Sequence, residues 1–194
     1  MALGIYIIFL CIAIGLRPLI QYRNTGDFGI RLVSRNANII TKLSSLMLMT
    51  GFLGSLALTI IDFMNPLSGM IGKAPWQLWI GVFLGVVGIV ITAIAQLQMG
   101  KDWRIGVDEA EQTGLVTRGL YRYSRNPIYS GVIIFILGLL LMVPNWLMLL
   151  LGGLIYLSIE MQVRGVEEPY LRNLHGQDFA EYCQQVGRYL PKIH

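Results

Sequence analysis

The chain has 194 residues, of which 55% are hydrophobic and only 13% are charged, and its formal net charge is +4. Soluble domains carry about 25% charged residues, so this composition indicates a membrane protein and argues against a soluble domain. The basic residues lie between apolar runs and form no stripe, which argues against nucleic-acid binding. The two cysteines, Cys11 and Cys183, and the two histidines, His175 and His194, lack the spacing of a metal site or a disulfide framework.

The first apolar segment covers residues 2–20, close to the roughly 20 residues that cross a bilayer. It has no positive region ahead of it and no small-residue cleavage site after it, so we interpret it as a retained membrane helix rather than a signal peptide. Arg17 lies near its end, where a long basic side chain is expected to snorkel toward water.

Two further apolar segments follow, at residues 43–61 and 76–96. The second of these contains Gly81, Gly85 and Gly88. Small residues at this spacing allow another helix to approach closely in a membrane, although the signal is weak by itself.

The next uncharged stretch, residues 126–159, is too long for one membrane helix. As a single helix it would measure about 50 Å, against a hydrocarbon core of about 30 Å. Pro144 and Asn145 lie near its middle, and this pair favours a turn. We therefore predict two short spans, residues 127–143 and 146–162, which form a helical hairpin.

The distribution of charge supports five spans. With this division, residues 21–42, residues 97–125, the tail after Gln162 and the end of the first span carry fourteen of the fifteen Lys and Arg residues, and only Lys73 falls on the other side. The positive-inside rule then places the N-terminus outside and the C-terminus in the cytoplasm. The predicted fold class is an all-α, multi-pass integral membrane protein with about five transmembrane helices.

The tail, residues 164–194, is polar and amphipathic. We expect two short cytoplasmic helices that are separated near His175 and Gly176. Residues 179–186 are expected to pack on the membrane face.

A first polar cluster lies where the fourth span begins. Asn is favoured at a helix N-cap and Pro at the first helical position, so Asn126 and Pro127 predict a helix start. The N-H groups and partial positive charge of such a start can bind a carboxylate or phosphate. The alternative is a membrane border, with Tyr121, Tyr123 and Tyr129 as an aromatic belt and the arginines at lipid headgroups.

A second polar cluster, Arg164, Glu167 and Glu168, ends the fifth span. A hairpin places both clusters at one membrane face. Together, a cation, two anions and a helix N-terminus can bind a zwitterionic cofactor beside an acidic substrate. The alternatives are a solvated helix end and an ion pair of Arg164 with Glu160 or Glu168, each one turn away.

The sequence contains no Gly-rich dinucleotide loop, P-loop, nucleophile elbow or zinc-protease motif. Its C-terminal half, about residues 97–191, nevertheless resembles the isoprenylcysteine carboxyl methyltransferase family. The ordered motifs that carry the resemblance are Leu115-Val116-Thr117-Arg118-Gly119-Leu120-Tyr121, Arg125-Asn126-Pro127-Ile128-Tyr129, Glu167-Glu168, and Gly176, Phe179, Tyr182, Val186 and Pro191.

The resemblance implies a membrane methyltransferase that uses S-adenosylmethionine and methylates the carboxylate of a lipophilic, prenylcysteine-like substrate. It implies a catalytic pair, Arg164 to hold the substrate carboxylate and Glu167 beside it in a role that the resemblance does not define. It implies no metal. The implied cofactor contacts are Thr113, Gly114, Leu115, Val116, Tyr121, Asn126, Pro127, Ile128, Tyr129 and Glu168.

The sequence departs from the family at Asn126, where the family usually has His. Asn can cap a helix but cannot act as a general base near neutral pH. Methyl transfer from a sulfonium to an ionised carboxylate is a direct displacement that needs no base, and it requires the reacting atoms to be held about 3–3.5 Å apart.

Two other functions stay open. A phospholipid or other small-lipid methyltransferase with an amine acceptor would need Glu167 or Glu168 as a base. A non-enzymatic scaffold or lipid-binding protein would explain the aromatic belt and basic loops. For the domain organisation we expect one membrane domain, 1–194, with an N-terminal helical pair, 1–62, and a methyltransferase core, 76–194. That core is divided into a cofactor-binding loop, 97–125, a hairpin, 126–163, and a cytoplasmic tail, 164–194.

Overall fold

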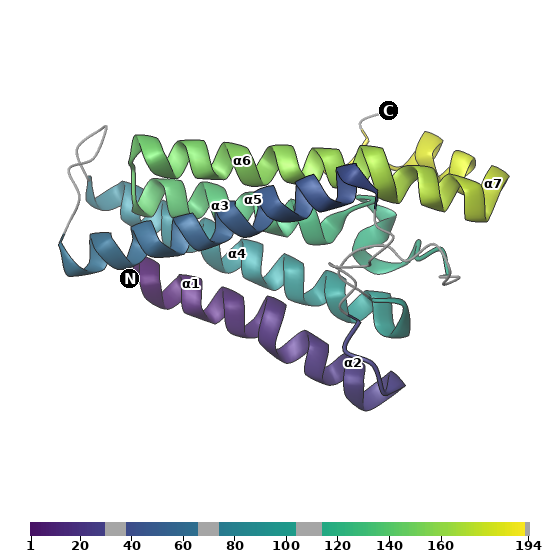
Figure 1. The fold of residues 1–194 in the computed structure, drawn as a ribbon, viewed down its shortest axis with the longest axis horizontal. Helices are drawn as coiled ribbons and strands as arrows, with labels where there is room; N and C mark the ends of the chain where they lie inside the picture. The colour runs from purple at the N-terminus through teal and green to yellow at the C-terminus, as the bar shows by residue number, and fades with distance from the viewer. Residues whose placement is uncertain (30–37, 66–73, 104–113, 193–194) are drawn as a thin grey trace.

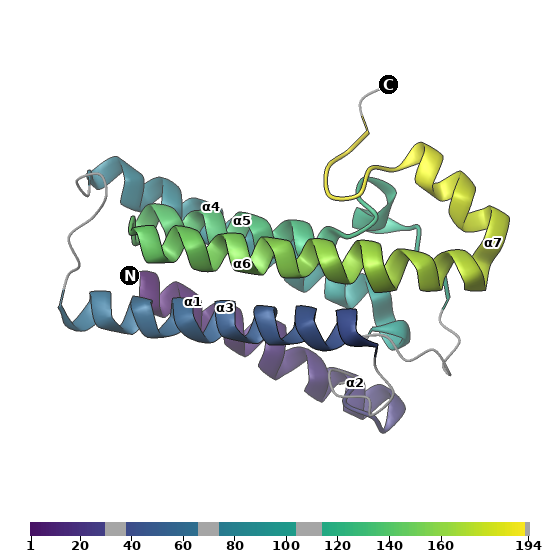
Figure 2. The ribbon, with the colours of Figure 1, turned by 45° about the horizontal axis from the view of Figure 1, so that its top comes forward.

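A computed structural model describes residues 1–29, 38–65, 74–103 and 114–192. Within these ranges the chain consists of helices and loops, with one isolated bridge between Ser124 and Gly187. The predicted all-α fold is confirmed. The long helices lie side by side, and α7 extends beyond one end of the bundle (Figures 1 and 2).

The helical elements follow one another in chain order. They are α1 (Ala2–Leu10), η1 (Cys11–Leu16), α2 (Arg17–Thr25), α3 (Ile39–Met64), α4 (Pro75–Met99), η2 (Gly100–Asp102), η3 (Gly119–Arg122), α5 (Pro127–Met142), α6 (Trp146–Gln162), η4 (Val163–Glu167) and α7 (Glu168–Gln185). The first three form one continuous helix, and α6 continues through η4 into the first part of α7. Both η1 and η4 are π-helical turns, whereas η2 and η3 are 3-10 turns.

Among the described residues, four continuous helices are long and apolar enough to cross a membrane, and α5 is a shorter apolar helix of 16 residues. These five segments match the five predicted spans, so the chain is a multi-pass membrane protein. The predicted turn at Pro144 and Asn145 is confirmed. It separates α5 from α6, and Asn145 starts α6 by accepting the Leu147 N-H at 2.9 Å.

The helices α4 and α5 pack against each other through glycines. A Cβ atom placed on Gly88 would lie 2.6 Å from the carbonyl oxygen of Gly131, and one placed on Gly138 would lie 2.6 Å from that of Gly81. No side chain fits at such distances, so the two backbones are in direct contact. The predicted close approach at the glycines of the third span is confirmed, and its partner is α5.

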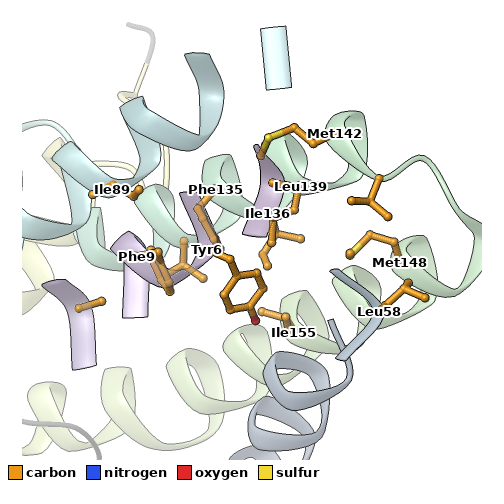
Figure 3. Close-up of a cluster of buried hydrophobic side chains, with 14 of the residues drawn as sticks. Tyr6, Phe9, Leu58, Ile89, Phe135, Ile136, Leu139, Met142, Met148 and Ile155 are labelled. Carbon is orange, nitrogen blue, oxygen red and sulfur yellow. The ribbon is translucent and has the colours of Figure 1, made fainter. Parts of the chain in front are cut away.

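Aromatic and aliphatic side chains fill the centre of the bundle (Figure 3). The rings of Phe9 and Phe135 stack with their centroids 4.0 Å apart, and Tyr6 meets Phe135 edge-on. The Tyr6 hydroxyl donates to the Phe52 carbonyl at 2.8 Å and lies 2.8 Å from Ser55 Oγ. Lipid offers no hydrogen-bond partner to a polar atom, so the Tyr6 hydroxyl finds its partners within the protein. It thereby joins α1 to α3, a link that a Phe at this position could not form.

The prediction that Arg17 snorkels to water is wrong. Its side chain is buried, with the residue 3% exposed. Nε donates to the Gln96 carbonyl at 3.1 Å, Nη2 donates to the Gly100 carbonyl, and the guanidinium lies 4.6 Å from the centroid of the Trp103 ring. The Gln96 carbonyl lies in the last turn of α4, where carbonyls lack an N-H partner within the helix and carry partial negative charge, and Gly100 follows α4 directly. These carbonyls hold the Arg17 cation inside the protein.

The tail contains the predicted break. Gly176 has φ 52° and ψ −118°, which divides α7 into two helical parts. The second part packs inward, because Phe179 and Tyr182 are buried against Leu115. The tail is not separate from the fifth span, however, since α6 continues through η4 into α7.

Candidate active site

The candidate site lies at one end of the α5–α6 hairpin. Three segments meet there: the start of α5, the η4–α7 junction and the residues Gly187–Tyr189, which we call the C-terminal strap. In both ribbon views the chain after α7 turns back beside the loop ahead of α5. The Arg125 N-H donates to the Gly187 carbonyl at 2.9 Å, and the Asn126 N-H donates to the Arg188 carbonyl at 3.0 Å.

Asn126 occupies the N-cap position of α5, and Pro127 is the first helical residue, as predicted. The Asn126 carbonyl accepts the Ser130 N-H at 3.0 Å, which closes the first turn. The expectation that the Asn126 side chain caps the helix is wrong. Its Nδ2 instead donates to the Arg188 carbonyl at 3.3 Å, because the C-terminal strap brings that acceptor next to it.

The two predicted polar clusters are in direct contact. The Tyr129 hydroxyl donates to Glu167 Oε1 at 2.5 Å, which joins the first turn of α5 to the end of η4. Both residues are half-buried. The predicted juxtaposition of the two clusters across the hairpin is confirmed at atomic contact.

Glu168 lies between two arginines. Arg188 forms a bidentate pair with it, through Nε to Oε1 and Nη2 to Oε2, both at 2.8 Å. Arg125 Nη2 lies 3.3 Å from Oε1. The hydrogen bond to Glu168 raises the pKa of the Arg188 guanidinium above its usual value, so this cation stays protonated. The carboxylate therefore links α7, the C-terminal strap and the loop ahead of α5.

Arg164 pairs with a residue outside this ionic cluster. Its Nε lies 2.5 Å from Glu160 Oε2, and its side chain is 62% exposed, against 16% for Glu160. Of the two partners considered from the sequence, Glu160 is the observed one. Arg164 thus offers an accessible cation one turn from Glu167 and Glu168, held in place by a shielded carboxylate.

The loop ahead of α5 rests on the end of α4. The Leu120 N-H donates to Gln98 Oε1 at 2.7 Å, and the Tyr121 hydroxyl donates to the Ala95 carbonyl at 3.4 Å. Tyr182 donates to the Tyr121 carbonyl. Burial raises the pKa of the Tyr121 hydroxyl, which stays a neutral donor.

The other predicted cofactor residues lie in the same region. Gly114 is exposed, whereas Leu115 and Val116 are partly buried, and Leu115 packs on the Phe179 cluster. Pro127 is buried and Ile128 half-buried in the first turn of α5. Thr113 lies outside the described residues.

A π-helical turn places the acidic residues. Such turns are rare and occur often at functional sites, because the extra residue rotates the side chains that follow. Here η4 covers residues 163–167, so Glu167 meets α5 and Glu168 meets the C-terminal strap. At its entry, Ser44 Oγ donates to Gln162 Oε1 at 2.8 Å, which ties α3 to the turn.

Sequence reasoning assigned no role to several residues of this site. Arg125 was part of a motif, but its ion pair with Glu168 was not foreseen. Arg188 gave no signal, because a lone arginine in a polar tail resembles a solvated charge. The missed partners are Gln98, Arg125, Arg188 and Ser130, the last of which donates to the Tyr189 carbonyl at 2.7 Å.

Comparisons with known proteins agree with this architecture. The sequence model of the phospholipid methyltransferase family matches residues 76–178, more than half of the chain. The chain therefore belongs to this family, whose matched region holds η4, α5 and α6. The residues after 178, including the C-terminal strap, lie beyond the match.

Individual relatives are isoprenylcysteine O-methyltransferases. The chain is 31% identical over 117 residues to a probable protein-S-isoprenylcysteine O-methyltransferase of Oryza sativa, covering 59% of this chain and 61% of the relative. It is 24% identical over 180 residues to protein-S-isoprenylcysteine O-methyltransferase B of Arabidopsis thaliana, covering 90% of each. The chain thus spans about three fifths of the rice relative. These relatives confirm the resemblance inferred from the motifs.

A solved structure shares the fold. The eukaryotic intramembrane Ras methyltransferase ICMT (isoprenylcysteine carboxyl methyltransferase) superposes with a TM-score of 0.57 at 21% identity, covering 98% of this chain and 74% of that chain. The similarity extends to the N-terminal helices, which the family model does not match. The whole described bundle is therefore part of one shared architecture.

Proposed function

We propose that this protein is an integral-membrane methyltransferase that transfers a methyl group from S-adenosylmethionine to the carboxylate of a prenylcysteine-like, lipophilic substrate. The observation that carries the proposal is the contact between Tyr129 and Glu167, which joins a helix start to an acidic cluster beside the exposed Arg164. The names of the relatives support the same reaction.

The residues present fit the charged ends of the cofactor. The N-H groups of Ile128 and Tyr129 lie in the first turn of α5, where a helix provides no acceptor of its own, so they suit a carboxylate. Glu167, which accepts from the Tyr129 hydroxyl, lies beside this turn and suits an ammonium or ribose hydroxyl. We assign Gly114–Val116 and Tyr121 to the adjoining wall. Thr113 stays a proposed contact.

When bound, the cofactor supplies an electrophilic methyl group on a sulfonium. The chain supplies orientation. Arg164 would hold the acceptor carboxylate, because a guanidinium has five N-H donors and its pair with Glu160 engages only one side. Glu167, fixed by Tyr129, would border the reacting atoms on the other side. An ionised carboxylate needs no general base, so Asn126 does not prevent this reaction.

The proposed topology puts the site at the cytoplasmic face, with the N-terminus outside. A substrate with a greasy chain would then reach Arg164 sideways from the bilayer, without leaving the lipid. We place the reaction in the core, residues 76–194, which comprises the loop 97–125, the hairpin 126–163 and the tail 164–194. The pair of helices in residues 1–62 would act as its support.

The test uses detergent-purified protein. Methyl transfer from labelled S-adenosylmethionine to N-acetyl-farnesylcysteine is measured together with a calorimetric titration of S-adenosylhomocysteine on the same sample. Transfer with binding supports the cofactor and the acceptor class. Binding without transfer contradicts the prenylcysteine acceptor. Neither signal, from protein that is demonstrably folded, contradicts the methyltransferase itself and favours a scaffold or lipid-binding role.

A second candidate, methylation of a phospholipid or small-lipid amine, is favoured by the family model that matches residues 76–178. An amine acceptor must lose a proton, and Glu167 is the candidate base. The dependence of kcat on pH separates an amine acceptor from a carboxylate acceptor. With an amine acceptor, kcat should fall as the pH drops below the pKa of the base, whereas transfer to a carboxylate should change little between pH 6 and 8.

A further inference from the structure

The lipid-facing surface of the bundle has an aromatic border at each end. Exposed tryptophans mark the end where α4 and α6 begin, and they are Trp76, Trp79 and Trp146. Exposed tyrosine and phenylalanine side chains mark the end where α2 and α4 finish, and they are Tyr22, Phe28 and Tyr123. In both ribbon views the ends of α2 and α4 and the loop ahead of α5 lie at the same end of the bundle (Figures 1 and 2). Because aromatic residues gather at membrane interfaces, these residues place the second border at the level of the lipid headgroups.

The second border carries basic side chains without an acidic partner. These exposed residues are Arg23, Lys101, Arg118 and Arg122. Among the residues that the structure describes, none of the four side chains forms an ion pair or a hydrogen bond. Arg125, in the same loop, instead lies 3.3 Å from Glu168 Oε1. The loop ahead of α5 therefore turns one arginine toward the protein and leaves two exposed.

The 3-10 turn η3 holds these two arginines in place, one at its N-cap and one at its last residue. The Leu120 N-H donates to Gln98 Oε1 at 2.7 Å, and Gly119, with φ 64°, allows the turn to rest directly on that side chain. Gln98 follows Leu97, where the exposed apolar stripe of α4 ends. The turn therefore lies at the edge of the lipid-facing surface.

The structure also separates the three tyrosines that the sequence suggested as an aromatic belt. Tyr121 is 6% exposed, and its hydroxyl donates to the Ala95 carbonyl at 3.4 Å. Tyr129 is half-buried and donates to Glu167. Tyr123 is 60% exposed, and its hydroxyl has no hydrogen-bond partner within the described part of the chain. Of the three, only Tyr123 is available to lipid.

We propose that η3 and Tyr123 form a docking surface for anionic phospholipid headgroups, in which Arg118 and Arg122 bind the phosphate. A guanidinium forms paired hydrogen bonds with phosphate oxygens, and two unpaired cations favour a headgroup of net negative charge over one that carries an ammonium. The occupant is a lipid because the turn borders the apolar stripe of α4, so a ligand with both a phosphate and acyl chains contacts the two surfaces at once. Headgroup binding at η3 is independent of the proposed methyl transfer.

The first experiment measures lipid selectivity at the turn itself. The full chain carrying Tyr123→Trp is reconstituted in nanodiscs of phosphatidylcholine that contain a minor fraction of either brominated phosphatidylglycerol or brominated phosphatidylcholine. Bromine quenches tryptophan fluorescence at short range, and the signal of the unchanged chain is subtracted to isolate the reporter. Brominated phosphatidylglycerol should quench this signal about twofold more strongly than brominated phosphatidylcholine, because the two arginines enrich it beside the reporter. Equal quenching by the two lipids would overturn the proposal.

Charge variants of the reporter chain test the arginines. The double substitution Arg118→Gln and Arg122→Gln should abolish the preference for phosphatidylglycerol, since each basic residue at a membrane surface strengthens binding to anionic lipid about fivefold. Arg118→Lys with Arg122→Lys keeps both charges but not the paired hydrogen bonds, so part of the preference should remain. The matched control is Arg172→Gln, an exposed arginine on α7, which should leave the preference unchanged. An equal loss in the control would mean that overall charge, not η3, attracts the lipid, and would contradict the proposal.

Inorganic phosphate distinguishes a lipid headgroup from a soluble anion. Added in excess over the brominated lipid, inorganic phosphate should leave the preference for phosphatidylglycerol unchanged, because it lacks the acyl chains that contact the α4 stripe. Loss of the preference with phosphate, but not with chloride at the same ionic strength, would assign η3 to a soluble anion and overturn the lipid assignment. None of these measurements uses S-adenosylmethionine. They therefore decide the lipid-docking role even if the protein transfers no methyl group.

Discussion

The N-terminal helices and the C-terminal half both bury polar side chains, but they pair them differently. In the N-terminal helices, Arg17 and Tyr6 donate chiefly to backbone carbonyls of neighbouring helices. In the C-terminal half, charged side chains from three separate segments meet one another around Glu168. A side chain that binds a helix end holds helices together, whereas facing charges create a region that can also bind a charged ligand. We therefore expect changes in the first region to affect stability and changes in the second to affect binding and turnover.

The largest effect is expected at Arg164. Replacing it by Ala should lower kcat/KM by about a hundredfold or more, because the acceptor carboxylate loses its orienting partner. Binding of S-adenosylhomocysteine should change little, since Arg164 lies outside the ionic cluster at Glu168. Arg172→Ala, an exposed arginine on α7, is the control. Equal activity in the Arg164 and Arg172 variants would contradict the proposal that Arg164 orients the acceptor carboxylate.

Arg17→Met tests the expectation that changes in the N-terminal helices affect stability. The variant loses two charge-assisted hydrogen bonds to the end of α4, so unfolding free energy should fall by about 2–4 kcal/mol. Thermal melting in detergent measures this, and kcat per folded molecule should be retained. If turnover instead collapses at unchanged melting temperature, Arg17 is part of the site and the division between the two regions is wrong.

The next largest effect is expected at the glycine contact between α4 and α5. Gly131→Ala places a methyl group 2.8 Å from the Gly88 carbonyl oxygen, so the helices must move apart at a cost of about 1–3 kcal/mol. Gly153→Ala on α6 is the matched control, because nothing lies within 4 Å of its Cβ position. Melting curves of the two variants give the comparison, and equal melting temperatures would mean that the backbones are not in contact.

The smallest effect is expected from Asn126→His. The observed role of Asn126 is to donate one hydrogen bond to the Arg188 carbonyl, and an imidazole N-H can do the same. Activity should therefore change less than about threefold and gain no dependence on pH between 6 and 8. A large gain in activity that follows imidazole titration would show that this position takes part in proton transfer.

Much of the architecture was predictable because it depends on local patterns. The length of apolar runs, the proline at 144 and the distribution of basic residues predict five segments and their hairpin. Each of these signals acts within one segment, through the thickness of the bilayer and the chemistry of helix starts. The juxtaposition of residues 125–129 with 164–168 followed from the hairpin alone.

Side-chain partners were less predictable. Arg17 looked like a snorkelling residue and is buried, and Asn126 looked like a side-chain cap and binds the C-terminal strap instead. In both cases the competing partner is a backbone carbonyl from a distant part of the chain, 79 residues away for Arg17 and Gln96 and 62 residues away for Asn126 and Arg188. Local sequence contains no information on which carbonyl comes within reach.

By itself, the sequence determined a multi-pass helical membrane protein, the family to which it belongs and the segments that form the site. Those features follow from hydropathy, from breaks in the helices and from ordered motifs. Only the tertiary structure decided that Glu168 pairs with Arg188 and Arg125, and that the C-terminal strap lies along the start of α5. The reason is geometric: an ion pair forms where packing brings two charges together, and packing depends on the whole chain.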